Sequence, residues 1–469
     1  MFPFRLFFRY AVGPVGNAAV GLLLLPLMSW YFSDSDIGRL VLLQTVAGLG
    51  IIVLGFGLDQ AYIREFHTDV NHAVLLKSLV FPPMVLSAAV AAALWLWRPQ
   101  WPAGQVLSLP DASLGVLCLL FVYSSLSARY LSLVLRMRER ALAFSLAQIL
   151  PKLSALLLIA ACMLSGWQAD TFLLLSVHVA GQWLAVAVLL WQVRQELSAA
   201  WRAGFSWRRL YSALAYGLPL AVSGVAYWGF TSADRWLLKA LAGLDRVGVY
   251  SLAVAFGAAA LVFQSVFATV WSPLVFKWAA DGGGREQVAA AARHMSAAIC
   301  AIVGLSGLCS PLIAHLLPTT YADVPYILLC TLLFPLFYTL TEVTGIGVHV
   351  CRRTVCLVLV SLAALLLNLF LLHLFIPLWG ARGAAMATAL SFWLFFAGKT
   401  ELSARLWQPL PRRRVYGATV SCLLACLAYT RWGSPAAYVY FVPLWLVFLV
   451  VPLWRYCGRL AVFLKSRAA

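Results

Sequence analysis

Seven of the charged residues that lie inside long apolar stretches of the chain or near their ends, where charged side chains are rare, are candidates for function. They are Arg64, Arg129, Lys152, Arg235, Asp59, Asp234 and Glu342. An ionisable group at membrane depth is expensive unless it is paired or hydrated, so each one marks a candidate functional site. The cationic residues could bind an anionic solute, and the acidic residues could pair with them or carry a proton.

The basic residues favour a site for an anionic ligand. Lys152 follows Pro151 in the interior half of one apolar stretch, where an unpaired lysine costs roughly 3 kcal/mol on insertion scales. Arg129 precedes Arg136 by about two helical turns, near the end of another stretch. We expect Lys152, Arg129 and Arg64 to line a cationic cavity. The alternatives are snorkelling to the surface, a topology-determining charge or a structural ion pair.

The acidic residues divide into one isolated carboxylate and two that have a basic neighbour. Glu342 lies in the middle of an apolar stretch, so it is a candidate for proton coupling, because a carboxylate there must be protonated or paired. Asp59 and Arg64 close one stretch and are expected to pair with each other. Asp234 and Arg235 are adjacent at the outer end of another stretch, and structural pairing is the preferred interpretation.

Metal and cofactor chemistry receive little support. The ten cysteines lie in or beside apolar runs and form no CxxC pair, and the histidines in the apolar stretches are isolated. We therefore predict no cofactor and no metal site. The segment Asp34-Ser35-Asp36 is formally a DxD sequence, which membrane glycosyltransferases can use to hold a metal ion, although two aspartates in a polar turn are common.

The elements that hold these residues are predicted to be transmembrane helices. The chain has 469 residues, of which 63% are hydrophobic and 11% charged, with a mean hydropathy of +0.90. A soluble domain would be about 25% charged. Because a membrane-spanning helix needs about 20 apolar residues, we predict an all-α polytopic membrane protein with about fourteen transmembrane helices. The predicted spans are 11–32, 40–58, 74–97, 112–134, 143–164, 171–191, 212–232, 248–272, 291–316, 325–349, 355–377, 382–404, 414–431 and 437–457.

The distribution of Lys and Arg predicts the topology. With fourteen spans, 26 of the 34 Lys and Arg residues fall on the same side of the membrane as both termini. Lys and Arg remain on the cytoplasmic side during insertion, so both termini are predicted to be cytoplasmic. The net charge of +18 follows from this bias and suits the anionic lipids of the cytoplasmic leaflet. No basic module for nucleic acid has room in the loops.

The chain is predicted to consist of two lobes. The longest polar break, 192–211, is a basic amphipathic segment, which is typical of a surface linker. It separates an N-terminal lobe (1–191) from a C-terminal lobe (212–404), which two extra helices follow (405–469). A weak repeat, SDIGRL at 35–40 and DRVGVY at 245–250, predicts two six-helix lobes of the same orientation, with a substrate site at their interface.

Four stretches carry a family resemblance. They contain GFGLDQAYIR at 55–64, YGLP at 216–219 with SADR at 232–235 and VGVYS at 247–251, LPTTYA at 317–322, and IPLWGARGAAMAT at 376–388. Each motif is weak alone, but their order and spacing are fairly specific. The chain resembles a polysaccharide repeat-unit flippase, which moves lipid-linked oligosaccharides, of the multidrug/oligosaccharidyl-lipid/polysaccharide exporter superfamily.

The resemblance implies a transporter and not an enzyme. It implies translocation of an undecaprenyl-pyrophosphate-linked sugar unit across the bacterial inner membrane for O-antigen, capsule or exopolysaccharide synthesis. The expected partners are this lipid-linked oligosaccharide, membrane lipids, a polysaccharide polymerase and other export machinery. No ATP site is required, since an anion leaving an inside-negative cell gains about 2.3 kcal/mol per charge per 100 mV.

Two other functions stay open on the sequence. A drug or metabolite antiporter of the same superfamily would rely on acidic residues inside the N-terminal lobe. The interiors of the first, third, fourth, fifth and sixth spans have none, and Asp59 lies at the end of the second span. A glycosyltransferase using Asp34 and Asp36 would need long external loops, which the predicted topology lacks. The first span, 11–32, carries no charge, unlike the first span of the related lipid II flippases.

Overall fold

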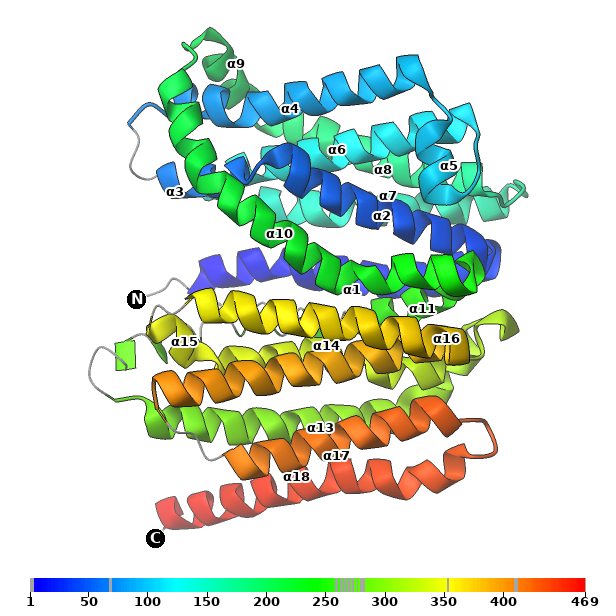
Figure 1. Ribbon diagram of the computed structural model, residues 1–469, viewed down its shortest axis with the longest axis vertical. Coiled ribbons are helices and arrows are strands. Elements are labelled where there is room, and N and C mark those ends of the chain that lie inside the picture. Colours follow the sequence, from blue (N-terminus) through cyan, green and yellow to red (C-terminus); the bar gives the residue numbers. More distant parts are fainter. Residues whose placement is uncertain are drawn as a thin grey trace. The chain divides into compact units, whose positions relative to one another are not determined.

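The protein is a bundle of α-helices, as a computed structural model shows (Figure 1). The structure describes residues 4–66, 70–257, 283–351, 354–408 and 412–468, together with scattered positions between 260 and 278. The chain divides into two compact units, Met1–Trp236 and Leu237–Ala469. Within the described residues the secondary structure is entirely helical, as the sequence predicted.

Unit 1 contains nine complete helices and most of a tenth. They are α1 (Phe4–Tyr31), α2 (Asp34–Gly55), α3 (Leu58–Glu65), α4 (His72–Trp97), α5 (Trp101–Leu107), α6 (Ala112–Met137), α7 (Ala141–Leu164), α8 (Thr171–Gln192), α9 (Arg194–Arg202) and α10 (Trp207–Ala242). Helix α6 packs on α2, α4 and α8, while α1 packs along α7. The division into units falls near the end of α10, after residue 236, whereas the sequence placed the linker at 192–211.

The remaining helices of the described chain belong to unit 2. They are α11 (Leu244–Gly257), α13 (Arg285–Leu316), a 3-10 turn (Thr319–Tyr321), α14 (Val324–Thr344), α15 (Ile346–Val350), α16 (Thr354–Leu406), α17 (Arg412–Trp432) and α18 (Tyr438–Ala468). Helix α14 packs against α11, α13, α16 and α17, and most of its residues are buried. Helices α2, α6 and α8 contact one another in unit 1, as α11, α14 and α16 do in unit 2.

Side-chain caps set where several helices begin. Asn71, Asp111 and Asp170 accept hydrogen bonds from backbone N–H groups three residues ahead, at the starts of α4, α6 and α8. The Ser113 hydroxyl also donates to Asp111, and these bonds lower the pKa of the Asp111 carboxyl. Ser33 caps α2 in the same way, so this helix begins at Asp34. Hydropathy alone predicted a start at residue 40.

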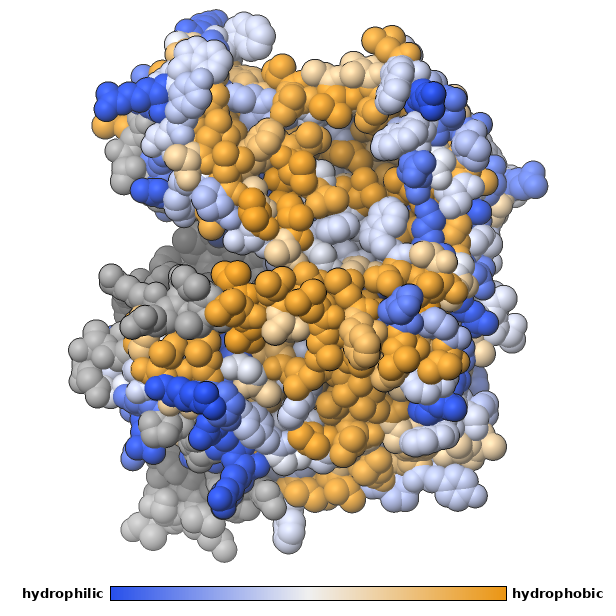
Figure 2. Space-filling view, in the orientation of Figure 1, coloured by the Kyte–Doolittle hydropathy of each residue, from blue (hydrophilic) through white to orange (hydrophobic). Residues whose placement is uncertain are grey.

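Ten helices within the described residues are long and apolar enough to cross a membrane. Figure 2 shows apolar residues over the middles of the helices and hydrophilic residues toward their ends. The chain is therefore a multi-pass membrane protein. The count of fourteen remains a prediction, and the predicted span 248–272 lies only partly within the described residues.

The 53-residue helix α16 includes one sharp break. Gly380 has a non-helical backbone (φ 53°, ψ −128°), and its two arms fold back on each other. Asn368 donates to Ser391, and Gly383 lies against the carbonyl of Phe375. A straight helix of this length would span roughly 80 Å, far more than a bilayer of about 30 Å. The two arms match the predicted spans 355–377 and 382–404.

Candidate functional site

A break between α2 and α3 positions the first group of charged residues. Phe56 and Gly57 both adopt left-handed backbone angles (φ 50° and 69°), so the chain changes direction there instead of continuing as the predicted span 40–58. A Cβ atom on Gly57 would lie 2.2 Å from the carbonyl oxygen of Gly217 in α10. Only glycine allows this backbone-to-backbone contact. The break directs α3 toward α6.

Asp59, at the start of α3, forms an ion pair with Arg129 of α6. The carboxylate oxygen lies 2.9 Å from the guanidinium nitrogen. The neighbouring Tyr130 hydroxyl donates to the carbonyl of Gly55 at 3.0 Å, which joins α6 to the end of α2. The Arg129 side chain is 45% exposed, so it can still reach a solute. The predicted pairing of Asp59 with Arg64 is wrong, because the break directs Asp59 toward α6.

Arg64 lies instead over an aromatic ring of α10. Its guanidinium carbon is 4.5 Å from the centre of the Tyr216 ring, a cation–π contact. This contact involves no carboxylate, so it leaves the positive charge of Arg64 uncompensated. Arg64 is exposed.

Lys152 lies at the middle of α7 and faces α1. Its ammonium nitrogen is 3.4 Å from the backbone carbonyl oxygen of Asn17, a long hydrogen bond. A Cβ atom on Gly21 would lie 3.0 Å from the same nitrogen, so glycine makes room for the lysine head. Lys152 is exposed. In the described part of the chain, no carboxylate forms an ion pair with it.

Glycines on one face of α1 allow this close approach to α7. Cβ atoms on Gly13 and Gly16 would lie 3.0 Å from the backbone of Ser145 and 2.4 Å from the side chain of Ile149. Helices can pack this closely where small residues face the partner. The α1–α7 contact thereby sets the position of Lys152 along the bundle.

Glu342 has a basic partner in unit 2 that the sequence analysis missed. The carboxylate of Glu342, in α14, lies 3.6 Å from the ammonium nitrogen of Lys399 in α16, and the side chains are 18% and 8% exposed. The Thr344 and Thr400 hydroxyls hydrogen-bond beside them at 2.6 Å. Lys399 lies near the end of the predicted span 382–404, and α16 continues to Leu406, roughly 10 Å further.

Asp234 and Arg235 do pair, as the sequence predicted. The Arg235 guanidinium lies 3.4 Å from the Asp234 carboxylate and donates to the carbonyl of Thr231 at 2.9 Å. All three residues belong to α10, and the Asp234 and Arg235 side chains are 7% and 15% exposed. The pairing agrees with the structural interpretation.

The DxD segment is also part of an ion-pair network. Asp36 lies 2.8 Å from Arg39 and accepts a hydrogen bond from Thr171 of α8, while Arg39 donates to the carbonyl of Leu107 at 3.2 Å. Within the described residues, no group of three or more His, Cys, Asp or Glu side chains could hold a metal ion. Asp36 therefore connects α2 with α8, and its charge is paired with that of Arg39.

Unit 2 has a comparable cluster that sequence analysis did not single out. Asp323 lies 2.7 Å from Arg382 and 3.6 Å from Arg246. Arg382 also donates to the carbonyls of Thr430 and Gly433, each at 3.2 Å. The cluster joins α11, α14, α16 and α17.

The three cationic candidates thus contact three different helices. Lys152 contacts α1, Arg129 contacts α3 and Arg64 contacts α10. Only Arg129 has a carboxylate partner among the described residues, and all three are exposed. The described part of unit 1 therefore presents uncompensated positive charge within and beside its membrane-spanning helices, which suits an anionic ligand.

Several proteins with solved structures have a fold similar to this one. The structure superposes on the lipid II flippase MurJ in an inward closed conformation, with a TM-score of 0.68 and 13% identity over 95% of this chain and 98% of that chain. It is also similar to a multidrug resistance MATE family transporter of the MOP superfamily (TM-score 0.58, 14% identity, 87% and 95% coverage). The structure of a mutant of the Vibrio cholerae MATE transporter VcmN is similar with a TM-score of 0.56 and 15% identity, over 86% of this chain and 96% of that chain.

The chain therefore shares its fold with these proteins. No curated protein sequence matches the chain. A sequence model of the family described as "Polysaccharide biosynthesis protein" matches residues 7–278, more than half of the 469 residues. The chain belongs to this family. Family and fold agree with the all-helical membrane protein that the sequence predicted.

Proposed function

We propose that the protein is a flippase for lipid-linked oligosaccharides in the bacterial inner membrane, with both termini in the cytoplasm. Its substrate would be a sugar repeat unit on undecaprenyl pyrophosphate, destined for a surface or secreted polysaccharide. The observation that carries the proposal is Lys152. It is an exposed cation roughly 16–18 Å from either end of α7, without a carboxylate partner in the described chain.

A comparison of Lys152 in α7 with Lys399 in α16 supports this assignment. Lys399 is 8% exposed and pairs with Glu342, as expected of a structural charge. Lys152 is exposed and has only the long bond to a carbonyl oxygen. An unpaired cation within the membrane is costly, and a bound pyrophosphate would offset this cost. Lys152 would therefore contact the pyrophosphate or the first sugar.

Arg129 and Arg64 would extend the cationic path toward the end of unit 1 where α3 begins. The exposed guanidinium of Arg129 keeps donor groups available beyond its contact with Asp59. Arg64 retains its charge over the Tyr216 ring. Guanidinium groups bind phosphate oxygens in pairs, so both could receive the diphosphate as it enters or leaves.

The membrane potential can supply the driving force. A pyrophosphate diester with about two negative charges gains about 4–5 kcal/mol on leaving a cell with an inside potential of about −100 mV. A polymerase that consumes the exported unit would pull the reaction further. The buried Glu342–Lys399 pair is our proposed site for proton coupling, since protonation of Glu342 would break it. This pair is also the observation that favours the second candidate, a drug or metabolite antiporter.

Export of glycan in a strain that depends on this protein tests the proposal. Lys152→Ala removes a charged contact worth about 1.5–3 kcal/mol, so flux should fall roughly tenfold to a hundredfold, with lipid-linked units accumulating inside. Lys152→Arg keeps the charge and should retain more export. Arg98→Ala is the control, because Arg98 lies outside the helices over the Trp97 ring.

Protein level in the membrane must be equal for all variants. Normal glycan export by Lys152→Ala would remove Lys152 from the site and the main support for an anionic substrate. Substrate-dependent proton release with cationic drugs, independent of sugar-pathway genes, would favour the antiporter instead.

A further inference from the structure

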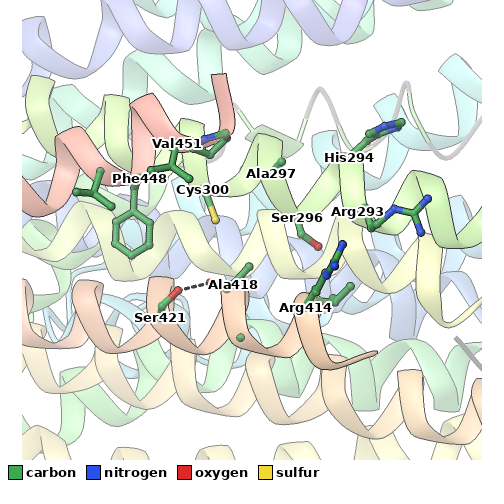
Figure 3. A pocket seen from close by; sticks show the side chains of 14 residues that line it. Arg293, His294, Ser296, Ala297, Cys300, Arg414, Ala418, Ser421, Phe448 and Val451 are labelled. Atoms are coloured by element: carbon green, nitrogen blue, oxygen red, sulfur yellow. Dashed lines mark hydrogen bonds between the residues drawn. The ribbon is translucent and has the colours of Figure 1, made fainter. Parts of the chain in front are cut away.

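A groove between α13, α17 and α18 in unit 2 has a polar mouth and an apolar interior. It encloses about 660 Å³, within the range of about 300–1,000 Å³ that is typical of ligand pockets. Figure 3 shows Arg293 and Arg414 at one end and Phe448 and Val451 further along. None of the residues discussed for the cationic path lines this groove.

Contacts between the helices establish this arrangement. The sulfur atoms of Cys300 and Cys422 lie 3.5 Å apart, and Ser310 hydrogen-bonds to Tyr429 at 2.8 Å. Because residue numbers rise together on both helices, α13 and α17 run in the same direction. Arg293 and Arg414 therefore lie at the same level, roughly 10 Å from the cysteine pair along the helices.

The start of α17 carries positive charge where an anion would be favoured. Its first three residues are arginines, and its first turn has no acidic residue. Cations at a helix N-terminus are unfavourable because the helix dipole is positive there. Arg412 is neutralised by Glu401 of α16. Within the described chain no carboxylate pairs with Arg293 or Arg414. A bound anion would compensate both arginines and the dipole.

The interior of the groove suits a hydrocarbon chain. Val447 and Val451 are 55% and 38% exposed, and they share the lining with Phe448 and Ala418. A free phosphate would occupy only the polar end of the groove. A ligand with an anionic head and an acyl chain would fill both parts. Basic pockets between membrane helices bind such head groups.

We propose that this groove binds an anionic phospholipid of the surrounding leaflet. Its phosphate lies between Arg293 and Arg414, and one acyl chain extends along α18 past Val451 and Phe448. Arg293 and Arg414 lie on the side predicted to be cytoplasmic, where anionic lipids are enriched. The inference is independent of the transported substrate, so Lys152→Ala should not affect it.

Thermal unfolding of the purified full chain in detergent tests the proposal. Dioleoyl phosphatidylglycerol should raise the melting temperature, while dioleoyl phosphatidylcholine and inorganic phosphate at equal concentration should not. Arg293→Gln with Arg414→Gln should weaken the apparent affinity at least about tenfold. Arg413→Gln is the matched control, because Arg413 belongs to the same helix turn but does not line the groove.

Ala418→Trp keeps both arginines and fills the groove, so it should also abolish the response. It keeps the test decisive if the arginine variant does not fold. An equal response to phosphatidylcholine would overturn the role of the arginines. A response to phosphate alone would indicate an ion site, and an equal loss in Arg413→Gln would indicate general surface charge. Either result would overturn the lipid site.

Discussion

The buried Glu342–Lys399 pair provides a sharp test of how charges are accommodated within unit 2. Glu342→Gln would leave Lys399 buried without a carboxylate, and Lys399→Met would leave Glu342 without a cation. The two charged atoms are 3.6 Å apart. At an effective dielectric constant of about 20, their attraction is about 4–5 kcal/mol before desolvation. Removing one partner of a buried pair typically destabilises a protein by about 3–5 kcal/mol.

The double variant Glu342→Gln with Lys399→Met should be more stable than either single variant. It removes both charges, and replacing a buried pair by neutral groups is often nearly neutral in stability. The pair of Arg412 with Glu401 is the control, because its side chains are 35% and 36% exposed. Arg412→Gln should therefore cost no more than about 1 kcal/mol.

The melting temperature of the purified chain in one detergent would measure these differences. We expect large decreases for both single variants, a small decrease for Arg412→Gln, and partial or full recovery in the double variant. Single variants as stable as Arg412→Gln would show that the pair is hydrated. A double variant that loses the sum of the two single effects would show that the residues are not coupled. Either result would refute the reasoning.

Three further predictions concern backbone contacts and the DxD segment. Gly217→Ala should reduce the amount of folded protein in the membrane, because its Cβ atom would lie 2.6 Å from a backbone oxygen, whereas Gly229→Ala in the same helix has open space and should be tolerated. Gly380→Ala should lower stability by about 1–3 kcal/mol, measured as a lower melting temperature, since the only obstacle is its left-handed backbone. Asp34→Asn should leave glycan export intact, whereas Asp36→Asn should lower the melting temperature through loss of its ion pair. Complete loss of export in Asp34→Asn would instead favour a metal-binding role for this segment.

Helix positions could largely be predicted where a capping residue coincides with the edge of an apolar stretch. Predicted spans 74–97, 112–134 and 171–191 begin within about two residues of α4, α6 and α8. The polar first turn of α2 was missed, because hydropathy does not register a capped polar start such as Asp34.

Partnerships between distant residues could not be predicted from the sequence. The α2–α3 break gives Asp59 a partner 70 positions away, and nothing local distinguishes Arg129 from Arg64 as that partner. Lys399 resembled a charge at the membrane surface because Glu401 and Arg405 follow it closely. Its burial depends on packing between α14 and α16. The roles of Lys152, Arg129 and Arg64 in substrate binding remain predictions.

The hairpin in α16 limits where the protein can be labelled. Its arms meet at a single glycine, so this turn offers no spare residues for a protease site, an epitope or a spectroscopic probe. The turn after α7 is more suitable. A Cβ atom on Gly166 there would have no neighbour within 4 Å, and Trp167 is 62% exposed. Insertions at this turn should report the sidedness of the membrane without disturbing the bundle.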